Sequence, residues 1–243
     1  MGGGLMQLVA YGQQDIYLTG NPQITFFKAI YKRHTNFAIE AIEQTINGTA
    51  DFGKKFSVTI ARNGDLLSRV YLELQYNEST FAKSSGSGCP GGSVPVGFNI
   101  INYTEIEIGG QIMDKQYGEW MTIWCDLTHT LDRKSMLNRM MFNGRRIGKV
   151  DESGYDHMPE GRSYIPLQFW FCRNIGLALP LIALQYHEVK INFDLKAYCA
   201  DRCDSNLLCN VAVYANYVFL DTDERRRFAQ SSHEYLIEQV QYS

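Results

Sequence analysis

Apolar and polar residues alternate one by one in four separate stretches of the chain, and this period of two leaves few folds open. Successive side chains of a β-strand point to opposite faces, so the alternation predicts strands with one buried and one exposed face. The four stretches are FSVTI at 56–60, VYLELQY at 70–76, VKINFDL at 189–195 and VAVYANYVF at 211–219. Because they are spread over most of the chain, they predict a protein built mainly of half-buried strands.

A further alternating stretch ends in a pair of glycines. Ile106 and Ile108 are followed at once by Gly109 and Gly110. Glycine readily adopts the positive φ angles that a two-residue hairpin turn requires. The sequence therefore predicts a tight β-hairpin at this point.

One region, from Lys115 to Met141, breaks the β pattern. Its large apolar residues recur at spacings of three, four and five, which is typical of helices. They are Trp120, Ile123, Trp124, Leu127, Leu131, Met136, Leu137 and Met140. We expect one or two helices inserted between strands, with these side chains packed against a sheet rather than around a cofactor.

Length and composition narrow the choice among all-β folds. A chain of 243 residues, of which 45% are hydrophobic, can bury a substantial core as one large domain. Many short strands separated by turns, with few helices, are typical of a sandwich or a barrel. This length favours an all-β, antiparallel jelly-roll sandwich of eight strands with a helical insertion over a smaller immunoglobulin-like domain. The fold class by itself leaves the function open.

Residues with catalytic or metal-binding chemistry do not cluster in the sequence. No histidine lies within two residues of another, as a cupin-type metal site on a jelly roll would require. The five histidines are His34, His129, His157, His187 and His233. Cys199, Cys203 and Cys209 lack the paired spacing of zinc ligands, and the sequence contains no phosphate-binding loop or nucleophile elbow. We therefore expect no catalytic site, no metal and no cofactor, and we expect that the protein is not an enzyme.

The charge pattern limits the partners. The formal net charge is −3, so the chain as a whole lacks the basic balance that attracts nucleic acid. Asp221 and Glu224 flank the start of the basic run at 224–228 and predict a capped helical turn there. No stretch approaches the roughly 20 apolar residues of a membrane span, and Gly2–Gly4 stand where a signal peptide carries positive charge. We expect cytosolic synthesis, no direct nucleic-acid binding and no transmembrane segment.

Three long stretches, in order along the chain, resemble one protein family. They are GGGLMQLVAYGQQDIYLTGNPQITFFKAIYKRHTNFAIEAIEQT at 2–45, YIPLQFWFCRNIGLALPLIALQYHEVKINFDL at 164–195 and DTDERRRFAQSSHEYLIEQVQ at 221–241. In these stretches the chain is similar to the major capsid proteins of nucleocytoplasmic large DNA viruses. The resemblance implies two consecutive jelly rolls and a subunit that assembles as a homotrimer. Six jelly rolls then form a pseudo-hexagonal capsomer that tiles an icosahedral shell.

The same resemblance implies the partners and the location. The partners are other copies of the chain, neighbouring capsomers and minor capsid proteins beneath the shell, and the protein is part of the virion after synthesis in the host cytoplasm. It also implies a division into an N-terminal arm at 1–35, a first jelly roll at 36–220 with a helical insertion at about 115–141, and a linker with the start of a second jelly roll at 221–243. No catalysis is implied.

Because the chain stops at Ser243, we expect it to be the N-terminal portion of such a protein. Two alternatives stay open. One is a minor capsid paralogue with a single jelly roll, and the other is a carbohydrate-binding jelly-roll module. The second would present exposed aromatic residues with clustered Asp and Asn, and the sequence contains no such cluster.

The N-terminal arm supplies the candidate assembly contacts. In the resembling proteins this segment runs along the base of the capsomer, where its aromatic residues contact their own domain or a neighbouring subunit. The candidates are Tyr11, Tyr17, Phe26, Phe27, Ile30 and Tyr31. Each of them could equally complete the local sandwich core.

Overall fold

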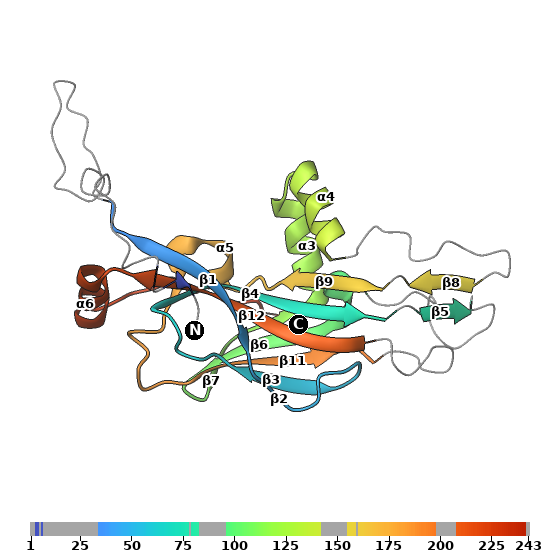
Figure 1. Ribbon diagram of the computed structural model, residues 1–243, viewed down its shortest axis with the longest axis horizontal. Helices are drawn as coiled ribbons and strands as arrows, with labels where there is room; N and C mark the ends of the chain where they lie inside the picture. Colours follow the sequence, from blue (N-terminus) through green and yellow to red (C-terminus); the bar gives the residue numbers. More distant parts are fainter. Residues whose placement is uncertain are drawn as a thin grey trace, which may run out of the picture.

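Strands dominate the structure. A computed structural model describes residues 3–4, 6, 34–77, 79–82, 96–141, 155–158, 160–197 and 208–241 (Figure 1). Within these residues, two five-stranded antiparallel sheets enclose a common hydrophobic core. A two-stranded pair, β5 (Ser79–Ala82) with β8 (Tyr155–Met158), lies at the opposite end of the molecule from α6 (Thr222–Gln230) (Figure 1).

The first sheet contains the N-terminal and C-terminal strands of the sandwich side by side. Its order is β1 (Phe37–Gln44), β12 (Leu208–Leu220) and β4 (Leu66–Tyr76), with β9 (Gly161–Pro166) and β10 (Leu179–Pro180) both paired to β4. The order of the second sheet is β2 (Ile46–Asn47), β3 (Lys55–Thr59), β11 (Val189–Leu195), β6 (Ile101–Ile108) and β7 (Gln111–Tyr117).

Neighbouring strands within each sheet are mostly far apart in the sequence. β12 lies between β1 and β4, and β11 lies between β3 and β6. The chain therefore crosses repeatedly from one sheet to the other, which is the strand arrangement of a jelly roll. The predicted fold class, an all-β antiparallel jelly-roll sandwich with a helical insertion, is confirmed.

The alternating residues supply the core as predicted. Leu72 and Leu74 of β4 and Ile191 of β11 are fully buried. Phe56 of β3 stacks on Phe193 of β11 with ring centroids 4.9 Å apart. Because burying a large apolar side chain contributes roughly 1.5–3 kcal/mol, these inward faces hold the two sheets together.

The predicted hairpin is also present. Ile108 at the end of β6 pairs with Gln111 at the start of β7. The two turn residues have positive φ angles, 60° at Gly109 and 87° at Gly110. These angles explain why the turn contains two glycines.

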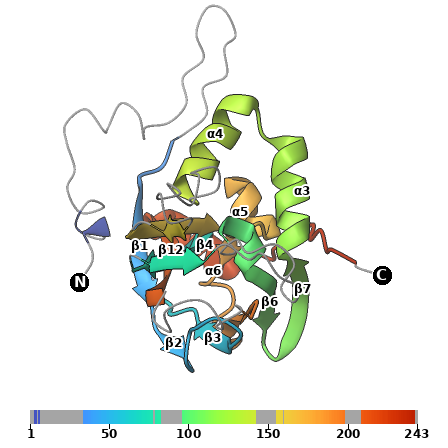
Figure 2. The same cartoon turned by 90° about the vertical axis from the view of Figure 1, so that its right-hand side faces the viewer.

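The helical insertion begins later than predicted. Residues 115–117 belong to β7, where Lys115 pairs with Glu105 and Tyr117 with Tyr103. Pairing with β6 satisfies the backbone of this stretch, and the apolar residues at helical spacing begin only at Trp120. The helices of the insertion are α3 (Gly118–Thr128) and α4 (Leu131–Met140), which project from the side of the sandwich formed by the first sheet (Figure 2).

Half of the apolar residues predicted to pack in this insertion do not do so. The buried residues of α3 are Gly118, Met121 and Cys125, which form a different stripe of the helix. Trp120 and Leu137 pack partly against the core. The exposed residues are Ile123, Leu127, Leu131 and Met136. The prediction that these four side chains pack against a sheet is wrong, because each helix presents only one stripe to the sandwich.

The other helices whose bounds lie within the described residues are short. They are α5 (Trp170–Arg173), α6 and the two 3₁₀-helices η1 (Gly97–Ile100) and η2 (Ile175–Leu177). The predicted helical turn at 221–224 is the start of α6, where the Asp221 side chain accepts a hydrogen bond from the Thr222 amide at 2.8 Å. After α6, residues 232–241 form neither helix nor strand.

Candidate assembly surfaces

The six residues predicted as assembly contacts cannot be placed. Tyr11, Tyr17, Phe26, Phe27, Ile30 and Tyr31 all lie outside the described residues. Their role as contacts between subunits stays a prediction.

The first described residues of the chain are fixed to β1. The amides of Gly3 and Gly4 donate to the two carboxylate oxygens of Glu40, each at 3.0 Å. A Cβ atom at Gly4 would lie 2.7 Å from the Phe219 ring, so a larger residue would force that ring to move. Glycine at position 4 therefore allows the backbone to approach the edge of the first sheet closely.

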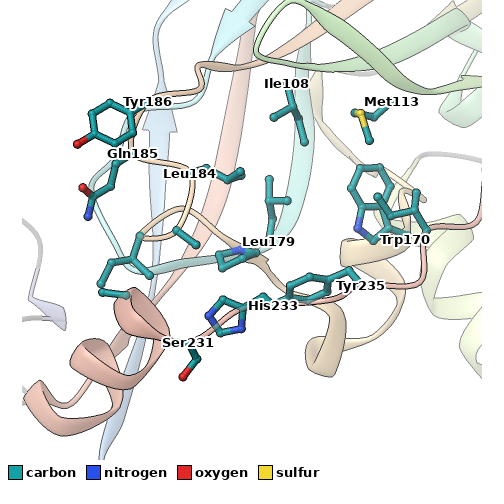
Figure 3. Close-up of a pocket in the computed structure, with 15 residues that line it drawn as sticks. Ile108, Met113, Trp170, Leu179, Leu184, Gln185, Tyr186, Ser231, His233 and Tyr235 are labelled. Carbon is teal, nitrogen blue, oxygen red and sulfur yellow. The ribbon is translucent and has the colours of Figure 1, made fainter.

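A hollow of about 510 Å³, which we call the base groove, lies beside the residues that follow α6. It is lined by Ile108, Met113, Trp170, Leu179, Pro180, Ile182, Ala183, Leu184, Gln185, Tyr186, Ala229, Ser231, His233, Tyr235 and Ile237. Figure 3 shows His233 and Tyr235 next to each other near Leu179, with Met113 and Trp170 together at one end of the hollow. Most of this lining is apolar, so the base groove is suited to an apolar partner.

The His233 ring in the base groove contacts another part of the chain. His233 Nε2 lies 2.6 Å from the Phe228 carbonyl oxygen, and the two rings stack with centroids 5.0 Å apart. A carbonyl only accepts, so Nε2 carries the hydrogen in this contact. Burial raises the pKa of Tyr235, which keeps its hydroxyl protonated.

Residues 231–241, which we call the C-terminal segment, are held against the sandwich by polar contacts. Arg173 Nη1 lies 2.9 Å from Glu238 Oε2. The Val240 amide donates to Asp114 Oδ1 at 3.1 Å. Burial raises the pKa of the Asp114 carboxyl, and the hydrogen bonds from Val240 and Gln116 act against that rise. These contacts fix the C-terminal segment along β7 and α5.

Large apolar side chains also lie on the outer surface. Leu127 is 80% and Leu131 88% exposed on the α3–α4 pair, and Phe37 is 62% exposed on β1. In the described part of the chain, β1 is the edge strand of the first sheet, so its exposed face is continuous with an unpaired edge. Exposed apolar groups and strand edges of this kind are surfaces on which proteins associate.

Potential metal ligands do not gather at one place in the described residues. No group of three or more His, Cys, Asp and Glu is placed there to hold a metal ion. Cys199 and Cys203 lie outside the described residues, and Cys209 is a free, exposed thiol. No described helix has the length and the apolar composition needed to cross a membrane.

Two-sheet jelly rolls occur in viral capsid proteins and lectins, and the exposed apolar side chains and free strand edge described above are surfaces through which such proteins associate. The family described as major capsid protein N-terminus matches residues 25–221, and the chain belongs to that family. The resemblance found in the sequence is thereby confirmed.

Individual relatives agree with the family. The chain is 53% identical to the major capsid protein of Pyramimonas orientalis virus and 47% identical to that of Phaeocystis pouchetii virus, in both cases over 100% of this chain. These matches cover 59% and 53% of the relatives, so the chain spans little more than half of their length. Among solved structures, the PBCV-1 virus capsid is similar with a TM-score of 0.72 and 39% identity, over 89% of this chain and 50% of that one.

Sequence reasoning missed the surfaces that the fold creates. The base groove combines residues from the β6–β7 hairpin, α5, the stretch at 179–186 and the residues after Gln230. No local motif marks a groove assembled from four distant stretches. The exposed apolar stripe of α3 and α4 could have been inferred from the sequence, because the insertion contains more large apolar residues than one face of each helix can bury.

Proposed function

We propose that the chain is a structural subunit of an icosahedral virus shell and assembles as homotrimers that form pseudo-hexagonal capsomers. The observation that carries this proposal is the two-sheet jelly roll in a chain that belongs to the major capsid protein family. The relatives with 43–53% identity over this whole chain include several named as major capsid proteins, which supports a structural rather than a catalytic role.

A shell subunit must contact copies of itself through several distinct surfaces. Three candidates lie on different parts of the molecule: the exposed face of β1, the outer stripe of α3 and α4, and the base groove. In a closed symmetric assembly, each contact is repeated in every copy, so contacts of modest strength sum to a stable shell.

The N-terminal residues are further candidates. We assign contacts with neighbouring subunits to Tyr11, Tyr17, Phe26, Phe27, Ile30 and Tyr31, which follow the pair of glycines fixed at Glu40. Residues 221–243 serve as the linker to a second jelly roll. The further partners are neighbouring capsomers and minor capsid proteins beneath the shell, and the protein is located in the virion after synthesis in the host cytoplasm.

Light scattering after size-exclusion chromatography tests self-assembly. The chain has a mass of 27.8 kDa, and we expect a species of three times that mass whose fraction grows with concentration. A chain that stays at 27.8 kDa at every concentration would contradict self-assembly of this part of the subunit.

A further inference from the structure

A second cavity, which we call the arginine cavity, lies between the α3–α4 pair and the outer side of the first sheet. Its volume is about 390 Å³. The lining comes from β4, α3, α4, α5 and the residues that follow β9. Three arginines from three different elements line it: Arg69 of β4, Arg133 of α4 and Arg173 of α5. Their convergence is a product of the fold, because any two of them lie at least 40 positions apart in the sequence.

The positive charge of this cavity is not balanced within its lining. No Asp or Glu is among the described lining residues. Arg173 reaches Glu238 with Nη1 and places its guanidinium carbon 4.6 Å from the centroid of the Trp124 ring. Its Nε is buried and has no hydrogen-bond acceptor among the described residues. Arg173 is therefore only partly satisfied by the chain itself.

The other two arginines are free to bind. Neither Arg69 nor Arg133 makes a hydrogen bond or an ion pair with another described residue, and both are exposed. Burial raises the pKa of the Cys172 thiol to about 12, and the positive charges of Arg69 and Arg173 act against that rise. Both guanidinium groups thus act on the same thiol, which supports their proximity across the cavity.

The three guanidinium groups that line the cavity repel one another, and an anion bound between them would offset this repulsion. The chain as a whole has a net charge of −3, so the local excess of positive charge is opposite in sign to the molecule. Guanidinium groups match the oxygen atoms of phosphate in geometry and donate two hydrogen bonds at once. Two unpaired arginines also match the charge of a phosphate group, which is roughly −1.5 to −2 near neutral pH.

We propose that the arginine cavity binds a phosphate group, either as inorganic phosphate or as a small phosphomonoester. Arg69 and Arg133 hold the anion, and the guanidinium of Arg173, which also lines the cavity, adds positive charge beside it. The volume lies in the range of about 300–1,000 Å³ that is usual for small-molecule sites, so it has room for more than the phosphate alone. This site is separate from the base groove, since the described linings of the two hollows share no residue.

Calorimetric titration of the 243-residue chain with inorganic phosphate, at constant ionic strength, tests the proposal. We expect saturable binding of one phosphate per chain. Arg69→Gln and Arg133→Gln should each weaken it at least about tenfold, since each removes a charged hydrogen-bond donor. Arg139→Gln is the matched control, because Arg139 lies on α4 but does not line the cavity. That variant should bind phosphate like the unaltered chain.

Phosphate titration of the unaltered chain tests the proposal even if a variant folds poorly. Titration without saturable heat would overturn the proposal, and so would equal affinity in the Arg69, Arg133 and Arg139 variants. Glycerol phosphate in the same titration separates the two sources of the group. Tighter binding than that of inorganic phosphate assigns the site to a phosphomonoester, and equal or weaker binding assigns it to free phosphate. Either result supports the phosphate site.

Discussion

The carboxylate of Asp65 and the guanidinium of Arg225 form a two-point ion pair. Arg225 Nε lies 2.9 Å from Oδ1, and Nη2 lies 3.1 Å from Oδ2. Oδ2 also accepts the amide hydrogen of Leu220 at 2.8 Å. Asp65 precedes β4, whereas Arg225 lies on α6, so this pair fixes α6 to the end of the sandwich.

Asp65→Asn should lower the free energy of unfolding by about 1–3 kcal/mol, because the amide NH₂ that replaces one carboxylate oxygen cannot accept from the guanidinium and the negative charge opposite Arg225 is lost. Urea unfolding at neutral pH measures this change. Asp223→Asn is the control, since Asp223 is an exposed residue of α6, and a change within about 0.5 kcal/mol is expected for it. Equal losses in the two variants would contradict the role of the ion pair.

Gly118→Ala should prevent the native packing of α3. A Cβ at this position would lie 2.2 Å from the Phe98 carbonyl oxygen and 2.4 Å from that of Ile101. Both obstacles are backbone atoms, so relief requires a shift of the chain and costs about 3 kcal/mol or more. Thermal unfolding followed by circular dichroism measures the loss. Gly3→Ala, which meets no atom within 4 Å, should unfold like the unaltered chain, and a normal melting temperature for Gly118→Ala would refute the close contact.

Stability should fall as the pH rises above about 9. Burial raises the pKa of the Cys125 thiol from 9.0 to about 11 and that of Cys172 to about 12. Above pH 9 the unfolded chain loses these protons while the folded chain keeps them, so alkali favours unfolding. The stability that the two protonated thiols contribute is fully present below pH 9 and is lost as the pH rises to 11–12.

Cys172→Ala provides the test of this pH dependence. The substitution removes packing, which lowers the free energy of unfolding equally at all pH values. It also removes the thiol, so the fall of the unfolding free energy with rising pH should become less steep by up to about 1.4 kcal/mol per pH unit. Urea unfolding at a series of pH values between 8 and 11 gives the slope. A slope identical to that of the unaltered chain would show that the Cys172 thiol does not titrate differently in the two states.

Replacing both Leu127 and Leu131 by Ser should weaken self-association without harming the fold. The two side chains are exposed, so unfolding free energy should change by less than about 1 kcal/mol in total. Light scattering should show a smaller fraction of the trimer at each concentration, because apolar area is removed from a contact. Arg139→Ser on α4 is the control, because it also introduces a serine on the surface of the helix pair but removes no large apolar side chain. Unchanged association of the double variant would exclude this stripe from the interface.

The strands were predictable from the sequence because alternation is a local signal. The alternating apolar residues of Val189–Leu195 and Leu66–Tyr76 are buried as predicted, although neighbours such as Glu73 and Asp194 are buried as well. The start of α3 was not predictable, because the helical spacing begins at Trp120 and does not mark where the preceding strand ends, whereas Lys115–Tyr117 still pair with β6, Tyr117 lying opposite Tyr103. Tertiary pairing decided their conformation.

The candidate surfaces were less predictable than the fold. Exposure of Leu131 depends on which stripe of the helix pair meets the sandwich, and periodicity alone does not select that stripe. The arginine cavity is harder still to find, since Arg69 and Arg173 occupy unrelated elements and neither is part of a motif. The predicted contacts in residues 11–31 lie outside the described residues and stay predictions.

In the first sheet, Phe37 at the start of β1 lies opposite Leu220 at the end of β12. The backbone thus enters and leaves the jelly roll at adjacent points on one side. Because these two ends are adjacent, we expect residues 37–220 to tolerate circular permutation, in which Phe37 and Leu220 are joined and new termini open at an exposed turn.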